Sequence, residues 1–419
     1  MLQKTLSPEM RAWRYRVFAS TWLCYAGYYF CRKPFYNAKS ALIEAHGWSS
    51  QLLGNVGAIY LITYAVGQFL AGQAGNRFGP RKVLLVGMLV TIAVNVVFGI
   101  TDSAATFAVF MGLNGLFQAT GWSSCVATVG RWFGRHERAA VMGPWATNFQ
   151  IGSIAAGFFS SWLLGHYGYQ WSFFGGSLVL LAIWTFFVFN QRDRPEDVGL
   201  PPIEDDEPHL PGADPSVADK MPLPVIFNIG LIGTFYFFAK LIRYAFWSWV
   251  PLLLTMHFGL TKQNSGYMTN IFDIAGFIGT SAAGLLAERV FKGSLARLSF
   301  FFILAMTVSM GLLYLGGTAN LTVFGISLFL VGFFLFGPDA LMTGAGAVAV
   351  GSPRHAARAA GTISAIGSLG PILQELVLPR YMKGDDVSTV FGLLLGSAVL
   401  CLLTLGWMLR RNARGMASV

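Results

Sequence analysis

The chain has 419 residues, of which 54% are hydrophobic and only 11% are charged. A soluble domain usually has about 25% charged residues, so this composition excludes an ordinary soluble protein and is typical of a chain that spans a membrane. The formal net charge of +10 is compatible with nucleic-acid binding. The basic residues, however, lie mainly in alternate loops between apolar runs, and we therefore expect no nucleic-acid partner.

Twelve apolar runs are long enough to cross about 30 Å of hydrocarbon, and each is predicted to be a membrane-spanning helix. In chain order, the expected spans cover residues 17–36, 50–74, 83–101, 104–130, 140–165, 171–190, 223–256, 265–287, 298–316, 319–348, 357–379 and 388–409. Pro144 and Pro371 lie inside spans. Because proline cannot donate the helix hydrogen bond, both residues are predicted to kink their helices.

The distribution of basic residues predicts the orientation of these spans. If both termini are cytoplasmic, most lysines and arginines fall in the tails and the cytoplasmic loops. The few in loops on the opposite side are Lys39, Lys262, Arg380 and Lys383. By the positive-inside rule, this bias places both termini in the cytoplasm. We expect a bacterial inner membrane because the loops are short and targeting extensions are absent; an endoplasmic reticulum membrane is the alternative.

The longest polar segment, residues 191–222, is rich in proline and contains the acidic run Glu204-Asp205-Asp206-Glu207. It is predicted to be a flexible cytoplasmic linker. The domains expected are an N-terminal six-helix bundle at 1–190, the linker at 191–222 and a C-terminal six-helix bundle at 223–419. The predicted fold is therefore an all-α membrane protein built from two pseudo-symmetric bundles.

An internal repeat supports this division. Gly72 and Arg77 after the second span recur 212 residues later as Gly284 and Arg289, while Arg32 and Arg243 are 211 residues apart. An arginine at bilayer depth costs at least about 2.5–3.5 kcal/mol. Arginine is also well suited to bidentate binding of phosphate or carboxylate. The pair at matching places therefore predicts one anion held between the two halves.

Several motifs resemble a known family. The stretch from Gly72 to Lys82 resembles the signature of the major facilitator superfamily after the second span, with Asn76 in place of the usual Asp. Further motifs resemble the organophosphate:phosphate antiporter family; they are Tyr29-Phe-Cys-Arg32-Lys33-Pro34-Phe35, Gly121-Trp122, Phe238-Ala-Lys240-Leu, Ile271-Phe272-Asp273 and Gly337-Pro338-Asp339-Ala340. The resemblance implies the major facilitator fold and one-for-one exchange of a phosphorylated sugar or polyol against inorganic phosphate.

The resemblance also implies roles for single residues. Arg32 and Arg243 match the two phosphate-binding arginines of the family, and Tyr25, Tyr29 and Tyr64 match tyrosines that line its cavity. Three positions depart from the glycerol-3-phosphate transporters, where Gln68 replaces a lysine, Phe149 a histidine and Lys240 a tyrosine. These departures weigh against glycerol 3-phosphate as the main substrate. The segments around Arg32, Gln68 and Lys240 are more similar to the eukaryotic sugar-phosphate exchangers, a resemblance that implies glucose 6-phosphate.

Helical spacing adds further candidates. Lys240 lies one turn before Arg243 and is predicted to be a third cation on the phosphate. The side chains predicted to line the substrate cavity are Tyr25, Tyr29, Tyr64, Gln68, Tyr236, Asn148 and Trp122.

The predicted gating or coupling residues are Lys33, Asp273, Asp339 and Glu375. Lys33 is expected to pair with Asp273. Asp339 or Glu375 is expected to pair with Arg32 or Lys240 in the empty state, or to carry a coupling proton, because an acid inside a membrane is a functional candidate by default.

The sequence has no phosphate-cradling P-loop, no nucleotide fingerprint and no HExxH or GxSxG motif, and its cysteines lack metal-ligand spacing. We therefore expect no cofactor, no metal and no enzymatic activity. The expected partners are a phosphorylated sugar, inorganic phosphate and the lipid bilayer, for a monomeric protein. Two alternatives are a transporter-like sensor of external sugar phosphate, and a proton-coupled transporter of glycerol 3-phosphate or another organic anion.

Overall fold

The computed structural model describes residues 7–203, 221–382 and 387–415, without the side chains of 135, 136, 139, 345, 347, 348 and 350–358. Most of the expected linker, residues 204–220, therefore lies outside the described part. Every regular element in the described part is a helix. Contacts divide the chain into two compact units, the first formed by Met1–Ala38 and Ile59–Asp214 and the second by Lys39–Ala58 and Pro215–Val419.

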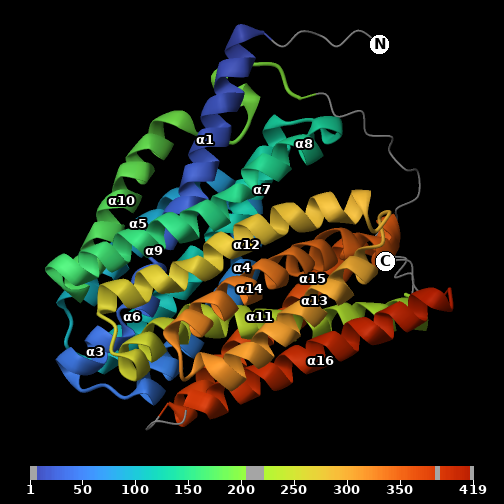
Figure 1. Cartoon of the computed structure of the whole chain (residues 1–419). Helices are drawn as coiled ribbons and strands as arrows, with labels where there is room; N and C mark the ends of the chain where they lie inside the picture. The colour runs from blue at the N-terminus through green and yellow to red at the C-terminus, as the bar shows by residue number, and fades with distance from the viewer. Residues whose placement is uncertain (1–6, 204–220, 383–386, 416–419) are drawn as a thin grey trace. The chain divides into compact units, whose positions relative to one another are not determined.

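The elements from the N-terminus to the end of the first unit are α1 (Pro8–Phe30), α2 (Lys33–Asn37), α3 (Lys39–His46), α4 (Ser50–Phe78), α5 (Pro80–Ile100), α6 (Ala104–Gln118), α7 (Thr120–Trp132), α8 (Arg135–Trp145), α9 (Thr147–Tyr167), α10 (Tyr169–Asn190) and the short 3₁₀ helix η1 (Pro195–Val198). In the first unit, α1 packs against α7, α9 and α10 (Figure 1). Its core contains Val17, Cys24, Trp132 and Trp145, which have no exposed surface.

The first expected span, residues 17–36, is not one helix. The helix α1 ends at Phe30, a short turn contains Arg32, and α2 starts at Lys33. Pro34 explains the break, because it has no N–H to continue the hydrogen-bond ladder of α1 but is tolerated in the first turn of a new helix. Arg32 therefore lies at a helix break rather than inside a helix.

Two more expected spans are divided. The expected span 104–130 forms α6 and α7, which meet at Ala119. The expected span 140–165 is interrupted at Ala146, between α8 and α9, directly after the turn that contains Pro144. By contrast, α15 runs through Pro371 without interruption.

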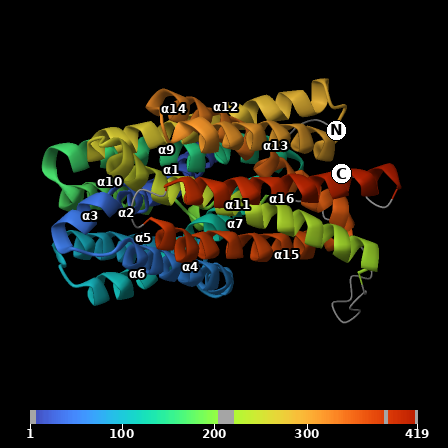
Figure 2. The ribbon, with the colours of Figure 1, turned by 60° about the horizontal axis from the view of Figure 1, so that its bottom comes forward.

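The remaining elements are α11 (Leu223–Phe258), α12 (Lys262–Arg289), α13 (Leu295–Leu312), the π-helical turn η2 (Leu313–Gly317), α14 (Leu321–Leu341), the π-helical turn η3 (Met342–Gly346), α15 (Ala347–Val377), the 3₁₀ helix η4 (Leu378–Tyr381) and α16 (Val387–Ala413). The long helix α11 packs against α15 and α16, and α12 packs against α14 (Figure 2). A Cβ atom at Gly370 of α15 would collide with the carbonyl of Phe237, so α11 and α15 approach closely because this residue is glycine. The loop expected between residues 348 and 357 is helical.

Nine helices in the described residues are long and apolar enough to span a membrane. They are α4, α5, α10, α11, α12, α13 with η2, α14 with the start of η3, residues 359–381 of α15 and η4, and α16. The first, fourth and fifth expected spans are not among them. The helix α1 starts in a charged segment, and the other two spans are each divided into shorter helices.

The segment Lys39–Ala58 differs from its expected place. It contains α3 and the first turns of α4. It is expected in the N-terminal bundle, but its contacts group it with the second unit. The helix α4 continues without a break from this segment into the first unit.

Candidate functional site

Arg32 is the centre of a cationic site in the first unit. Its guanidinium carbon lies 4.8 Å from the ring centroid of Tyr29, 5.2 Å from that of Tyr64 and 5.9 Å from that of Tyr60. A guanidinium within about 6 Å of an aromatic face is attracted by the ring quadrupole. We call Arg32, these tyrosines and Gln118 the first arginine site.

Gln118 at the end of α6 holds the Arg32 side chain in place. Its Oε1 accepts hydrogen bonds from Arg32 Nε and from the Tyr60 hydroxyl, both at 3.0 Å. Its Nε2 donates to the Cys31 carbonyl at 3.2 Å and to Asn114 Oδ1 at 3.0 Å. All the hydrogen-bonding capacity of this amide's N–H groups is used, so its orientation is fixed.

The Arg32 side chain is nearly buried, with 6% of the residue exposed. Its Nη2 atom is buried and has no hydrogen-bond partner among the residues that the structure describes. A buried charged donor without a partner is costly, whereas an anion placed there would satisfy it. The first arginine site therefore has the chemistry of an anion site.

An aromatic cluster lies beside Tyr29 in the same unit. The Tyr25 ring contacts Tyr29 at 6.0 Å, Trp122 at 5.3 Å and Trp145 at 6.4 Å between centroids. The Trp122 and Trp145 rings are 5.4 Å apart. Trp145 is fully buried, while Trp122 is 36% exposed and presents part of its ring. The structure thus brings the predicted cavity residues Tyr25, Tyr29 and Trp122 together.

Two other residues predicted to line the cavity, Asn148 and Gln68, differ from each other in burial. Asn148 at the start of α9 is fully buried, and neither of its side-chain amide atoms has a hydrogen-bond partner in the described part of the chain. An unpaired buried amide is a candidate for a solute hydroxyl. Gln68 on α4 is exposed. No described contact links it to Arg32.

The second unit has its own cationic site, and it differs from the first. The guanidinium of Arg243 on α11 forms an ion pair with the Asp339 carboxylate on α14, and both side chains are largely buried. The guanidinium carbon lies 5.5 Å from the Trp247 ring and 5.5 Å from the Phe336 ring. We call Arg243, Asp339, Lys240, Tyr236 and Trp247 the second arginine site.

Lys240 lies one turn before Arg243, as expected. Its ammonium sits 4.6 Å from the centroid of the Tyr236 ring. In the described structure Lys240 forms no ion pair. The expectation that Asp339 would pair with Arg32 or Lys240 is corrected, because its partner is Arg243.

Asp273 on α12 accepts a hydrogen bond from Trp247 Nε1 at 2.6 Å. Lys33, in the first turn of α2, is 3% exposed. The predicted pair between Lys33 and Asp273 joins residues of different units and stays a prediction.

Glu375 on α15 also has a partner other than the expected Arg32 or Lys240. Its carboxylate lies 3.2 Å from the ammonium of Lys39, and both side chains are fully buried. Lys39 was expected in a polar loop. Burial lowers the pKa of Lys39 to about 8, and the Glu375 carboxylate opposes this shift, so the ammonium form still predominates at neutral pH.

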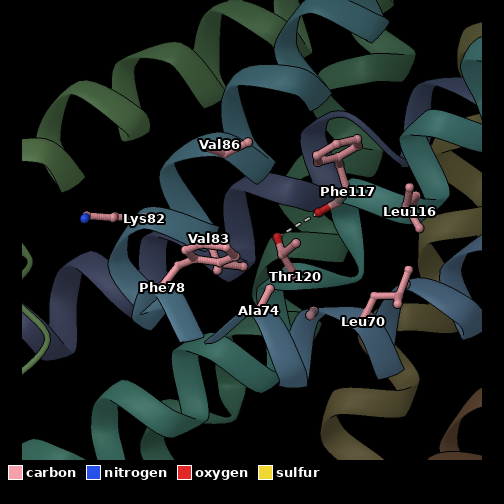
Figure 3. Close-up of a pocket in the computed structure, with 11 residues that line it drawn as sticks. Leu70, Ala74, Phe78, Lys82, Val83, Val86, Leu116, Phe117 and Thr120 are labelled. Atoms are coloured by element: carbon pink, nitrogen blue, oxygen red, sulfur yellow. Dashed lines mark hydrogen bonds between the residues drawn. The ribbon is translucent and has the colours of Figure 1, made fainter. Parts of the chain in front are cut away.

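The described structure also contains an apolar pocket of about 430 Å³ between α4, α5, α6 and α7 (Figure 3). None of the predicted site residues lines it. The Thr120 hydroxyl is directed to the Phe117 carbonyl at 2.7 Å. The lining is mainly apolar, and its one charged residue, Lys82, points away from the other labelled side chains (Figure 3), so the pocket suits an apolar group better than a phosphate.

Sequence reasoning missed several residues of these sites. They are Gln118, Asn114, Tyr60 and Trp145 in the first unit, and Trp247, Ser248, Trp249 and Lys39 in the second. Gln118 and Asn114 are polar residues inside an apolar run, a signal that could have identified them. Nothing in the sequence indicates that the lysine of an expected loop would be buried.

Known proteins resemble the chain over most of its length. Residues 21–374 match the Major Facilitator Superfamily. The chain is 27% identical to a probable hexose phosphate transport protein from Chlamydia pneumoniae, over 86% of this chain and 83% of the relative. It is 27% identical to the membrane sensor protein UhpC from Salmonella typhimurium, over 89% and 86%. A solved structure of the peptide transporter POT in complex with sulfate superposes with a TM-score of 0.78 at 13% identity, over 97% of this chain and 96% of that one.

These likenesses agree with the architecture. The superfamily match covers most of the chain, and the structural neighbour has the same fold at low identity. The predicted all-α, multi-pass membrane fold is confirmed. The chain belongs to the major facilitator superfamily.

Proposed function

We propose that the chain is a membrane antiporter that exchanges a phosphorylated sugar, with glucose 6-phosphate as the first candidate, for inorganic phosphate by alternating access. The observation that carries this proposal is Arg32. Its Nε is fixed by Gln118, and its buried Nη2 has no hydrogen-bond partner in the described structure. A phosphate dianion supplies both the charge and the geometry that a guanidinium prefers. The names of the relatives add support.

In the second arginine site, the carboxylate of Asp339 competes with the substrate for Arg243. The Asp339 carboxylate already occupies the guanidinium of Arg243, so a phosphate that reaches Arg243 must displace it. We therefore expect the solute to contact Arg32 first and to bind Arg243 only after Asp339 is displaced. Lys240 adds positive charge beside Arg243.

This arrangement favours exchange over one-way transport. In major facilitator proteins the halves rock about a central site. If both arginine sites face one solute, phosphate compensates the charges of Arg32 and Lys240, neither of which forms an ion pair in the described structure, and so removes the repulsion between them. An empty carrier keeps that repulsion and changes state slowly.

The test is exchange in proteoliposomes that contain the purified protein. We expect uptake of labelled glucose 6-phosphate only when phosphate or another organophosphate is inside. Uptake at full rate into vesicles without an internal counter-substrate would refute obligatory exchange. A thermal-shift screen with glucose 6-phosphate, glycerol 3-phosphate, phosphoenolpyruvate, phosphoglycerate and phosphate would rank the ligands.

A second candidate function is a sensor of external sugar phosphate, favoured by the relative named as a membrane sensor protein. A sensor would bind the same ligands through the same arginine sites. Ligand-induced stabilisation without any exchange in proteoliposomes would therefore support the sensor. A proton-coupled organic-anion transporter, with Asp339 or Glu375 as the proton carrier, would instead show uptake that depends strongly on a pH gradient and needs no internal phosphate.

A further inference from the structure

A cluster of charged and polar side chains lies buried between α11 and the last turn of α15 in the second unit. Lys39 Nζ donates a hydrogen bond to Ser248 Oγ at 2.5 Å and lies 3.2 Å from Glu375 Oε2. The Ser248 hydroxyl donates to the other oxygen of the same carboxylate. The ammonium also sits 3.3 Å from the ring centroid of Trp249. Lys39, Ser248 and Glu375 have no exposed surface.

The start of α4 closes over this cluster. A Cβ atom at Gly57 would lie 2.7 Å from the carboxyl carbon of Glu375, so only glycine allows this approach. Trp249 Nε1 donates to Gln374 Oε1 at 2.9 Å and fixes the ring under the ammonium. The cluster therefore joins α3 and the start of α4 to α11 and α15.

The place of these residues in the chain makes the cluster unusual. Lys39–Ala58 packs with the second unit, yet the chain enters the first unit on both sides of it. One of these junctions, at Ala58, falls inside the continuous helix α4. A movement of one unit against the other must therefore bend α4 or release Lys39–Ala58.

A buried ion pair is a poor way to gain stability, because apolar residues of similar volume usually do as well or better. Such pairs are better attested as devices that select one discrete arrangement. A second pair between the segment and the second unit, Lys262 with Glu44 at 2.5 Å, is 31% and 73% exposed and is screened by solvent. Of these two described pairs, the buried one is thus better suited to control release.

We propose that Lys39 and Glu375 form a latch that holds Lys39–Ala58 against the second unit in one state of the transport cycle and is broken in the other. This inference rests on the proposed alternating-access function. It assigns to Lys39 a gating role that does not involve contact with the substrate.

The first test measures the latch without substrate. Spin labels on Asn55→Cys and Tyr381→Cys, both at exposed positions, report the distance across the latch in the full-length protein in lipid nanodiscs. We expect Lys39→Met or Glu375→Gln to raise the population of a longer distance by about tenfold or more. Labels on Leu315→Cys and Tyr381→Cys, both in the second unit outside the segment, should report no change. An unchanged distance across the latch in both folded variants would overturn the proposal.

The second test asks whether release is needed for turnover. Gln51 Nε2 contacts the Leu376 carbonyl at 3.5 Å, so cysteines at positions 51 and 376 can be joined by a short bifunctional thiol reagent that is cleaved by reduction. We expect the cross-link to stop exchange and reduction to restore it, whereas a cysteine pair at Gln263 and Tyr267 within α12 should have no effect. Exchange at full rate in the cross-linked protein would show that the segment Lys39–Ala58 stays in contact with the second unit throughout the cycle, which would refute the proposed latch. If the unmodified protein exchanges nothing, the proposed function fails, and the spin-label distances still decide on the latch.

Discussion

Arg243 and Asp339 form an ion pair inside the second unit, whereas Arg32 in the first unit is held by the neutral amide of Gln118. The two arginines occupy matching places in the repeat, yet among the described residues only Arg243 has an anionic partner. Arg32 therefore keeps an uncompensated charge, whereas the charge of Arg243 is neutralised until Asp339 is displaced, and in the second site the charge of Lys240 remains.

This difference predicts the effect of Asp339→Asn. The amide keeps the shape of the side chain but removes the competitor for Arg243, so inorganic phosphate should bind about tenfold more tightly, or about 1.4 kcal/mol. Isothermal titration calorimetry measures the change in Kd. The matched control is Asp273→Asn, which alters the partner of Trp247. An equal gain in phosphate affinity in both variants would show that Asp339 does not compete specifically for Arg243.

Arg32→Lys and Arg243→Lys test the guanidinium fork. Each keeps the charge and loses bidentate geometry, so exchange should fall by about 10- to 100-fold while the protein still inserts. The loss should be larger for Arg32→Lys, because lysine cannot reproduce the fixed Nε contact to Gln118. Arg297→Lys, at an exposed position, controls for a general effect of the substitution. Wild-type exchange in both site variants would exclude the arginine sites from substrate binding.

Gln118→Leu tests how Arg32 is oriented. Leucine removes the acceptor shared by Arg32 and Tyr60, and a hydrogen bond to a charged group is worth about 1.5–3 kcal/mol. We expect KM for phosphate to rise by about 10- to 100-fold. The comparison is Asn114→Ala, which removes a contact of Gln118 but none of Arg32. Similar KM values in the two variants would show that Gln118 contributes packing and does not orient Arg32.

Trp122→Ala separates the sugar from the phosphate. The partly exposed ring of Trp122 belongs to the aromatic cluster beside Tyr25, which suits the apolar face of a hexose. Loss of an aromatic contact should raise KM for glucose 6-phosphate by about 3- to 10-fold and leave KM for inorganic phosphate unchanged. Competition assays with both solutes measure the two values. A parallel rise in both KM values would show that Trp122 acts on phosphate binding or on the packing of the protein rather than on the sugar.

The buried pair of Lys39 and Glu375 predicts a stability pattern. Lys39→Met leaves a buried carboxylate without its counter-ion and should lower the free energy of unfolding by about 3–5 kcal/mol. The double variant Lys39→Met/Glu375→Leu replaces both charges with apolar groups and should recover most of this loss. Thermal unfolding in detergent gives the comparison. A double variant as unstable as the single one would show that the pair itself stabilises the fold.

The sequence predicts the membrane fold and the surroundings of the arginines well, because apolar length and intramembrane charge are local signals. Tyr25, Tyr29 and Tyr64 group near Arg32, and Lys240 lies beside Tyr236. The counter-ions could not be predicted. Which acid meets which cation depends on contacts between distant helices, so Asp339 and Glu375 have partners that spacing does not indicate.

The same limit applies to Lys39. Positive-inside reasoning assigns it to a polar loop, because that rule counts charges along the chain and ignores tertiary burial. The break after α1 was missed although Pro34 is visible in the sequence. An apolar run suggests one continuous helix even where a proline requires a new start.

The break between α1 and α2 has an electrostatic consequence. Because α1 ends at Phe30 and α2 begins at Lys33, Arg32 lies between the negative end of one helix dipole and the positive end of the next, so the two fields oppose each other. Arg243 lies inside α11, far from both ends of that helix. Backbone dipoles therefore compensate neither arginine. A solute that reaches Arg32 meets a charge that no described carboxylate neutralises, whereas at Arg243 it meets a charge that a side chain already holds.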